Sequence, residues 1–262
     1  MKMKAMRTTA ASAALFLLAG TGSALADNHE DDSGDGFIPI EIFACNFEDG
    51  MGPDDLNAVT AKWNEWMDDE GATDYFAAHM YPNFSSELGF DVAWIGGWRN
   101  GNAMGAGADM WLGEGSDLGD EFDAVLDCPT HTLFASARMK DPGESGEDDN
   151  TFVLSFSNCS IKEGREFEEV EAAQAAWNAY ADEHGFKGGS WYFWPVWGEA
   201  GDADYDFKAV GSTPNYTTLG ANFQLMADGH WRKSQEIWDG MLDCDSARIY
   251  TTFMVREMPD DE

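Results

Sequence analysis

The chain has 262 residues and a formal net charge of −34 at pH 7, with 49 acidic against 15 basic residues. This excess of negative charge repels nucleic-acid phosphates and anionic lipid surfaces, so it excludes nucleic acid and membrane as expected partners. Hydrophobic residues make up 44% of the chain, which is enough for packed cores, and we interpret the charge as an adaptation to a salty medium.

The first 26 residues have the pattern of a secretory signal peptide. Lys2, Lys4 and Arg7 precede an apolar run at 13–19, and small residues at 24–26 suit cleavage. The apolar run is too short to span a bilayer, and no later stretch is apolar enough to do so. Removing this segment takes away three basic and no acidic residues, so the charge becomes −37. We expect an exported protein, periplasmic or extracellular.

Acidic segments divide the remaining chain. Residues 27–37 are predicted to be an acidic disordered leader, 141–150 an acidic linker that contains proline and glycine, and 258–262 an acidic tail. They leave two longer segments, 38–140 and 151–257, and each is about the size of a small domain.

The two longer segments are copies of one unit. Cys45 and Trp63 are 18 positions apart, and so are Cys159 and Trp177. With slips of one residue, the match continues through Trp66 and Tyr180, Gly50 and Gly164, Tyr81-Pro82 and Trp194-Pro195, 90–92 and 205–207, Gly105 and Gly220, and 126–128 and 242–244. Two homologous repeats, called repeat 1 and repeat 2 below, are the simplest interpretation.

Repeat 1 begins with a predicted strand and a predicted helix. Residues 38–47 are mainly apolar and are followed by the turn residues Asp49 and Gly50, which is typical of a buried strand. The helix is expected between the acidic pair at 54–55, which suits a helix N-terminus, and Gly71, which tolerates the left-handed conformation at a C-terminus. Its apolar face comprises Leu56, Val59, Trp63 and Trp66.

A hairpin, a helical connection and a last strand complete the repeat. Aromatic-rich strands are expected at 75–81 and 90–98, and the Gly-rich connection at 96–119 is expected to include a short helix. A second helix should end at Cys128, before a fourth strand at 132–139. Residues that mark this second helix are Phe122, Val125 and Leu126 in repeat 1, and Trp238, Met241 and Leu242 in repeat 2. The first helix of repeat 2 carries Phe167, Val170, Trp177 and Tyr180.

The order β-α-β-β-α-β resembles the ferredoxin-like fold, in which both helices cover one face of an antiparallel sheet. The other face is rich in aromatic residues and needs a cover, which the second repeat supplies. The chain therefore resembles the dimeric α+β barrel superfamily, with both halves fused in one polypeptide as in some haem-binding members. The resemblance predicts an α+β fold in which two ferredoxin-like repeats pack their antiparallel sheets face to face as a single-chain α+β barrel.

These resemblances leave an enzyme and an assembly protein as alternatives to a protein that binds a small molecule. The chain is most similar to an uncharacterised family of secreted proteins from marine bacteria, which share a cysteine, a Trp-x-x-Trp helix and a Leu-Asp-Cys segment, and which imply no function. The superfamily implies either a cofactor-independent monooxygenase or a haem-dependent enzyme. Haem would need an axial histidine, and no ligand motif surrounds His29, His79, His131, His184 or His230. An extracellular assembly or interaction protein, of unknown oligomeric state, is the third class.

Four cysteines in an exported chain are typical of two disulfides. Strand four of a ferredoxin-like unit lies beside strand one, so the resemblance implies the pairs Cys45–Cys128 and Cys159–Cys244. Closing loops of this length corresponds to roughly 4 to 5 kcal/mol of chain entropy for each bridge. Because the cysteines show no Cys-x-x-Cys spacing and the histidines do not cluster, we predict no metal site.

No motif with a known mechanism was found, neither a Gly-x-Ser-x-Gly elbow, nor His-Glu-x-x-His, nor a phosphate loop, so we assign no catalytic residue. A ligand site is expected between the repeats, where aromatic strand faces would form walls and one acidic and one basic residue would be the polar groups. The candidate residues are His79, Tyr81, Tyr192, Trp194, Asp206 and Lys208. The alternative is an interior packed solid with aromatic side chains.

These observations predict an exported, disulfide-linked, two-repeat protein without intrinsic catalysis or a resident cofactor. Its expected ligand is a small aromatic or apolar organic molecule held between the repeats.

Overall fold

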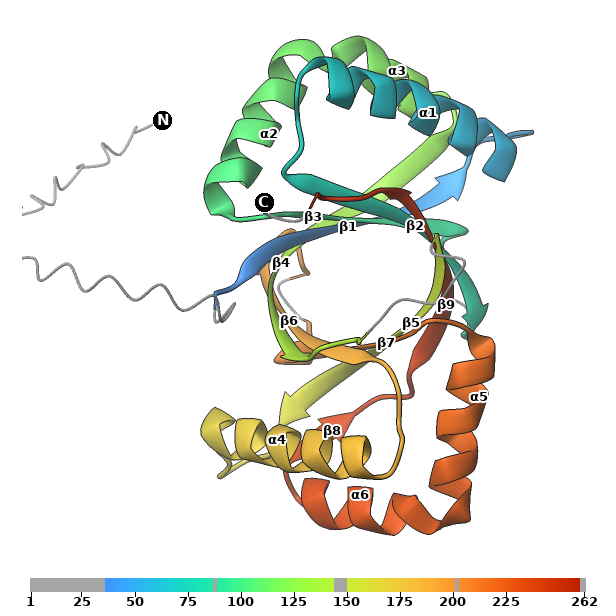
Figure 1. Cartoon of the computed structure of the whole chain (residues 1–262). Helices are drawn as coiled ribbons and strands as arrows, with labels where there is room; N and C mark the ends of the chain where they lie inside the picture. The colour runs from blue at the N-terminus through green and yellow to red at the C-terminus, as the bar shows by residue number, and fades with distance from the viewer. Residues whose placement is uncertain (1–35, 87–88, 144–149, 201–202, 260–262) are drawn as a thin grey trace, which may run out of the picture. The chain divides into compact units, whose positions relative to one another are not determined.

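The computed structural model describes residues 36–86, 89–143, 150–200 and 203–259 (Figure 1). The predicted signal peptide lies outside the described residues, as do nearly all of the leader and most of the linker and the acidic tail.

Both repeats have the predicted element order. Repeat 1 contains β1 (Ile38–Phe47), α1 (Pro53–Asp69), β2 (Tyr75–Phe84), β3 (Val92–Trp98), α2 (Gly101–Glu114), α3 (Ser116–Asp123) and β4 (Leu126–Lys140). Repeat 2 contains β5 (Thr151–Ile161), α4 (Phe167–Glu183), β6 (Gly189–Trp197), β7 (Phe207–Thr213), α5 (Tyr216–Leu225), the π-helical turn η1 (Met226–His230), α6 (Trp231–Trp238), β8 (Leu242–Cys244) and β9 (Arg248–Arg256). Repeat 2 thus builds its last strand from two pieces, β8 and β9.

The strands form one closed antiparallel barrel, which confirms the predicted fold class. Their order is β7-β6-β4-β1-β3-β2-β9-β5, pairing of β5 with β7 closes the ring, and β8 adds to β5. The repeats join at both edges, because β4 pairs with β6 and β2 pairs with β9. Figure 1 shows α1 to α3 outside the ring on one side and α4 to α6 on the opposite side. Closure leaves the eight barrel strands without an open edge.

Successive side chains of each strand serve two different cores. One set points into the barrel and forms a buried cluster of Ile40, Ala78, Met80, Ala93, Ile95, Phe134, Leu154, Phe156, Phe193, Val210 and Tyr250. The other set points outward beneath the helices. It includes Tyr75 and Ala77 under α1 in repeat 1, and Tyr192 and Phe207 under α4 in repeat 2. Both sets of alternate residues along a strand are therefore apolar.

The disulfides are those predicted, Cys45–Cys128 and Cys159–Cys244. Each ties the first strand of a repeat to the strand piece that follows its last helix. Two disulfides indicate an oxidising compartment. Among the described residues, none of the helices has the length and apolar character needed to cross a membrane.

The predicted second helices end too late in both repeats. α3 ends at Asp123 and α6 at Trp238, whereas Leu126, Cys128 and Leu242 lie in strands. Leu126 pairs with Phe47 of β1, and Leu242 pairs with Ile161 of β5. Pairing with a neighbouring strand therefore overrides the helical spacing of the apolar residues at these positions.

Removing one disulfide tests the part that chain entropy plays in stability. We expect replacement of both Cys159 and Cys244 by alanine to lower the free energy of unfolding by about 4 kcal/mol, because the bridge closes a separation of 85 residues. Urea unfolding of the oxidised variant and the oxidised parent at pH 7 measures the difference. Equal unfolding free energies would contradict a bridge formed in the folded protein.

Candidate functional site

The structure places His79 in the helix-covered layer rather than between the repeats. Its ring is almost fully buried, with Nε2 3.2 Å from Thr60 Oγ1 of α1 and the ring centre 5.3 Å from that of Trp94. Burial lowers the pKa of His79 to about 4, because the charged form would lose its hydration. A neutral imidazole packed under a helix is the result.

The predicted aromatic wall residues also face outward. Tyr81 packs against the cluster that holds Cys45 and the base of α1. The Tyr192 hydroxyl donates to Gln174 Oε1 of α4 at 2.8 Å, and Trp194 lies edge-on to Phe167 with ring centres 5.5 Å apart. These side chains therefore do not line a space between the repeats. Alternate residues along these strands are apolar on both faces of the sheet. The sequence pattern therefore does not distinguish the face that lines the barrel interior from the face that the helices cover.

The two predicted polar residues separate from each other. Asp206 is exposed, and its carboxylate accepts a hydrogen bond from the backbone N–H of Ile161 at 2.7 Å. Lys208 lines a cavity at one end of the barrel. Of the six candidate residues, only Lys208 lines this cavity between the repeats.

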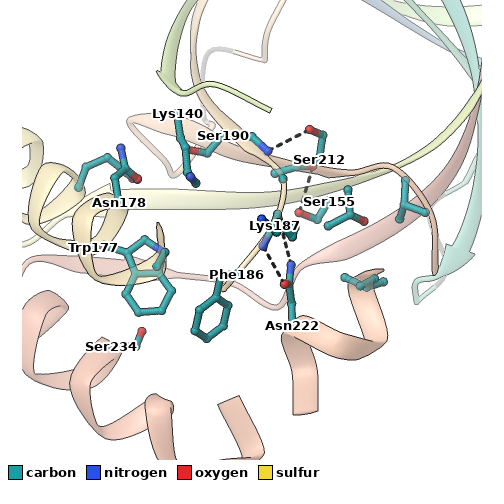
Figure 2. Close-up of a pocket in the computed structure, with 18 of the residues that line it drawn as sticks. Lys140, Ser155, Trp177, Asn178, Phe186, Lys187, Ser190, Ser212, Asn222 and Ser234 are labelled. Atoms are coloured by element: carbon teal, nitrogen blue, oxygen red, sulfur yellow. Dashed lines mark hydrogen bonds between the residues drawn. The ribbon is translucent and has the colours of Figure 1, made fainter. Parts of the chain in front are cut away.

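A cavity of about 380 Å³ lies in repeat 2, between the outer face of β5, β6 and β7 and the helices α4 to α6 (Figure 2). Apolar side chains supply much of its wall, namely Val153, Trp177, Phe186, Leu219 and Trp238. Polar side chains lie between them, namely Ser155, Asn178, Ser190, Ser212, Asn222 and Ser234, with Lys140 and Lys187 as the cations. We call this space the helix–sheet cavity.

The corresponding space in repeat 1 is a packed aromatic core. The ladders identify the matching positions, since His79 pairs with Trp94 in repeat 1 and Tyr192 pairs with Ala209 in repeat 2. The residues that fill the space in repeat 1 are Trp63, Met67, Tyr75, Trp94 and Trp98. Their counterparts in repeat 2 are Trp177, Ala181, Gly188, Ala209 and Thr213. Four of the five large side chains are thus replaced by small ones, and only the tryptophan of the first helix remains.

Contacts within repeat 1 show how completely that space is used. The ring centres of Trp63 and Trp94 are 4.9 Å apart, and those of Tyr75 and Trp98 are 4.8 Å apart. The Tyr75 hydroxyl donates to Glu41 Oε1 at 2.6 Å and accepts from the Trp94 indole N–H at 2.9 Å. Burial, and then the charge of Glu41, raise the pKa of Tyr75, so the hydroxyl stays a donor.

Glycines bring the backbone close to the floor of the helix–sheet cavity. At Gly188 φ is +110°, and a Cβ there would lie 2.0 Å from the carbonyl oxygen of Ser212. Only glycine allows the chain to enter β6 along this path. The adjoining loop is held to α5, because the Lys187 backbone N–H donates to Asn222 Oδ1 at 3.1 Å and the Asn222 amide donates back to the Lys187 carbonyl at 2.8 Å (Figure 2).

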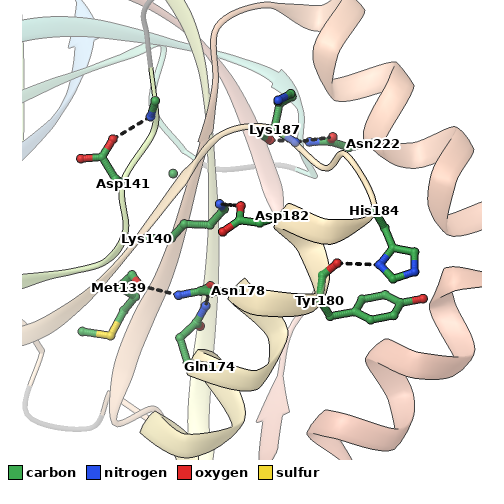
Figure 3. A network of polar contacts seen from close by, with 12 residues as sticks. Met139, Lys140, Asp141, Gln174, Asn178, Tyr180, Asp182, His184, Lys187 and Asn222 are labelled. Atoms are coloured by element: carbon green, nitrogen blue, oxygen red, sulfur yellow. Dashed lines mark hydrogen bonds and ion pairs between the residues drawn. The ribbon is translucent and has the colours of Figure 1, made fainter.

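A chain of hydrogen bonds orients the polar wall on the α4 side (Figure 3). Gln174 Nε2 donates to Asn178 Oδ1 at 2.7 Å, and Asn178 Nδ2 donates to the Met139 carbonyl at 2.6 Å. By contrast, the buried Ser190 hydroxyl has no hydrogen-bond partner in the part of the chain that the structure describes. This hydroxyl is covered by the surrounding side chains and out of reach of solvent.

The charge of the helix–sheet cavity is opposite to that of the chain. Its lining includes two lysines and no acidic residue. The Lys140 ammonium pairs with Asp182, which lies outside the cavity lining (Figure 3). No carboxylate within the described ranges forms a salt bridge with Lys187. The cavity is therefore suited to an anionic group.

Comparisons with known proteins establish the fold alone. No protein-family model and no curated protein matches the sequence. A protein from Lactobacillus acidophilus, provisionally named a monooxygenase, has 12% identity and a TM-score of 0.53 over 84% of this chain and 95% of its own. An arginine-to-lysine variant of chlorite dismutase from Candidatus Nitrospira defluvii has 10% identity and a TM-score of 0.51 over 84% of this chain and 93% of its own. The chain thus has a chlorite dismutase-like tandem α+β barrel fold, with two disulfides.

The residues of the helix–sheet cavity do not fit a haem. Haem iron is held by histidine, cysteine, methionine or tyrosine, and none of these lines the cavity. His184 and His230 lie nearby, but they are engaged with Tyr180. The His184 ring stacks on that of Tyr180 with centres 4.0 Å apart, and the Tyr180 hydroxyl lies 2.6 Å from His230 Nδ1.

The buried His79 gives stability a specific pH dependence. The unfolded chain binds a proton at this histidine near pH 6.5, whereas the folded protein does so only near pH 4, so stability falls as the pH drops through this window. We expect His79→Gln to reduce the loss of unfolding free energy between pH 7 and pH 4.5 by about 2.5 kcal/mol. Urea unfolding of both proteins at the two pH values measures it. An identical loss in parent and variant would contradict a buried neutral His79.

Proposed function

We propose that the protein is an exported binding protein for a small aromatic or apolar molecule that carries an anionic group, and that the ligand occupies the helix–sheet cavity of repeat 2. The observation that carries this proposal is the difference between the repeats. Where Tyr75 and Trp98 fill repeat 1, Gly188 and Thr213 leave space in repeat 2. Export is supported by the signal-peptide pattern and by the two disulfides.

The size of the cavity supports a ligand. Its volume of about 380 Å³ lies within the roughly 300 to 1,000 Å³ of small-molecule sites. The space opens to solvent, so it holds water when no ligand is bound, and the hydroxyl and amide groups of its lining can hydrogen-bond either one.

The arrangement of the lining suggests the chemistry of the ligand. Trp177, Phe186 and Trp238 offer aromatic surface for a flat apolar body. Lys187 offers a cation, and Asn178 and Ser234 offer polar side chains. The ring of an aromatic carboxylate or sulfonate would pack on the aromatic side chains, and its anionic group would pair with the lysine. The proposed activity is binding, with the polar groups setting the orientation of the ligand.

The probe 1-anilinonaphthalene-8-sulfonate, an aromatic anion, tests this site. We expect one saturable site on the folded protein, measured by probe fluorescence. The double variant Ala181→Met and Thr213→Trp, which restores the residues of repeat 1, should weaken binding at least tenfold. Because it fills a cavity, it should raise the free energy of unfolding by roughly 0.5 to 2 kcal/mol.

Charge variants provide the control for this experiment. Lys187→Gln should weaken binding of the probe several-fold, because the cation beside the sulfonate is lost. Lys62→Gln removes the same charge at an exposed position of α1 that pairs with Glu121, and should leave binding unchanged. Equal binding by the filled double variant and the parent would contradict the proposed site.

A further inference from the structure

A second cavity of about 380 Å³ opens at one end of the barrel, between the two repeats. Strands of both repeats line it, and we call it the barrel-end cavity. Its inner wall includes Met80, Phe134 and Phe156, which belong to the buried cluster of the barrel interior. The cavity is therefore an opening in the apolar core, separate from the helix–sheet cavity, and no lining residue is shared between the two.

Matching positions of the two repeats give this cavity one apolar and one polar side. In repeat 1, Ala44 of β1 pairs with Ala93 of β3. At the same ladder position of repeat 2, Asn158 of β5 pairs with Lys208 of β7. All four residues line the cavity. The half of the mouth that repeat 1 supplies and the half that repeat 2 supplies thus have matching strand pairs. The repeat 1 half is apolar and the repeat 2 half is polar.

Lys208 brings an incompletely neutralised positive charge to the apolar core. Only 18% of its side chain is exposed, and its ammonium donates to Asn158 Oδ1 at 2.9 Å. Its ion pair with Glu199 is long, at 4.0 Å, and this carboxylate also accepts a hydrogen bond from the Tyr205 hydroxyl. Burial lowers the pKa of Lys208, because the ammonium has lost much of its hydration. Burial removes part of the hydration that stabilises the ammonium. A further anionic partner would replace part of that stabilisation.

The other charges at the mouth leave a net positive lining. Arg248 lines the cavity and pairs with Asp245 at 2.5 Å, and Asp245 is not part of the lining. The lining therefore contains two cations, Lys208 and Arg248, and one carboxylate, Glu199. The lining of each cavity therefore contains more cations than carboxylates, although the net charge of the chain is −34.

We infer that the barrel-end cavity binds an aliphatic carboxylate, with its carboxylate on the Lys208 ammonium and its chain directed along Ile42, Met80 and Phe156 into the barrel. The alkyl chain would contact apolar side chains of the barrel core. Each methylene group that leaves water on binding increases the affinity. The carboxylate accepts from Lys208 and lies within the field of Arg248. This site is independent of the helix–sheet cavity and does not rest on its proposed function.

Calorimetric titration of the full chain with sodium octanoate at pH 7 tests this inference. We expect one saturable site, with affinity falling roughly fourfold for each methylene removed in heptanoate and hexanoate. Lys208→Met, which keeps an apolar side chain of similar length, should weaken octanoate binding at least tenfold. Lys62→Met makes the same charge change at an exposed position of α1 and should have no effect.

Two further variants separate this site from the helix–sheet cavity. Ala44→Leu narrows the apolar half of the mouth without touching a charge and should also weaken octanoate binding. The double variant Ala181→Met and Thr213→Trp should bind octanoate as the parent does, whatever it does to the aromatic probe. The inference is overturned if octanoate does not bind, or if the double variant abolishes binding while Lys208→Met leaves it intact.

Discussion

Every strand of this barrel has to bury both of its faces, and that constraint governs the rest of the molecule. One face fills the barrel and the other lies beneath helices, so alternate residues serve separate cores. In β2, Ala78 and Met80 pack inside while Ala77 and His79 pack outside. The closed ring, the flanking helices and the tolerance for a buried neutral histidine all follow from this arrangement.

Each repeat has a space beneath its helices and supplies one half of the barrel mouth, and the two repeats differ in both places. Repeat 1 keeps a solid aromatic core under its helices, tied to β1 by the Tyr75–Glu41 hydrogen bond. Repeat 2 keeps the matching tryptophan, Trp177, but surrounds it with small residues and serines. At the barrel mouth the change is from Ala93 to Lys208. In both places repeat 1 supplies a packed frame and repeat 2 supplies polar groups, while the disulfides hold the corresponding strands together in each repeat.

Much of the fold could be predicted from the sequence because it rests on local signals. The 18-residue spacing from Cys45 to Trp63 recurs in repeat 2, and the element order then implied both disulfides. Placing the ligand residues required knowing which phase of a strand faces the interior, and Tyr192 and Lys208 show that the apolar pattern does not reveal it. The spacing of Phe122, Val125 and Leu126 predicts a helix, whereas Leu126 lies in a strand. Strand pairing joins residues far apart in the sequence, so it leaves no local pattern at Leu126. A position-by-position comparison of the repeats, with Tyr75 against Gly188 and Trp98 against Thr213, was the signal that could have located the helix–sheet cavity.

The space under the helices is a packed core in repeat 1, and we propose that it is a ligand cavity in repeat 2. The most direct measurement is a crystal structure of the protein purified from its native host, at a resolution that shows ordered water. We expect non-protein density bounded by Trp177, Ser190 and Lys187, and none in the matching space of repeat 1. Rings of Trp177 and Trp238 turned inward to close the space in repeat 2 would contradict it.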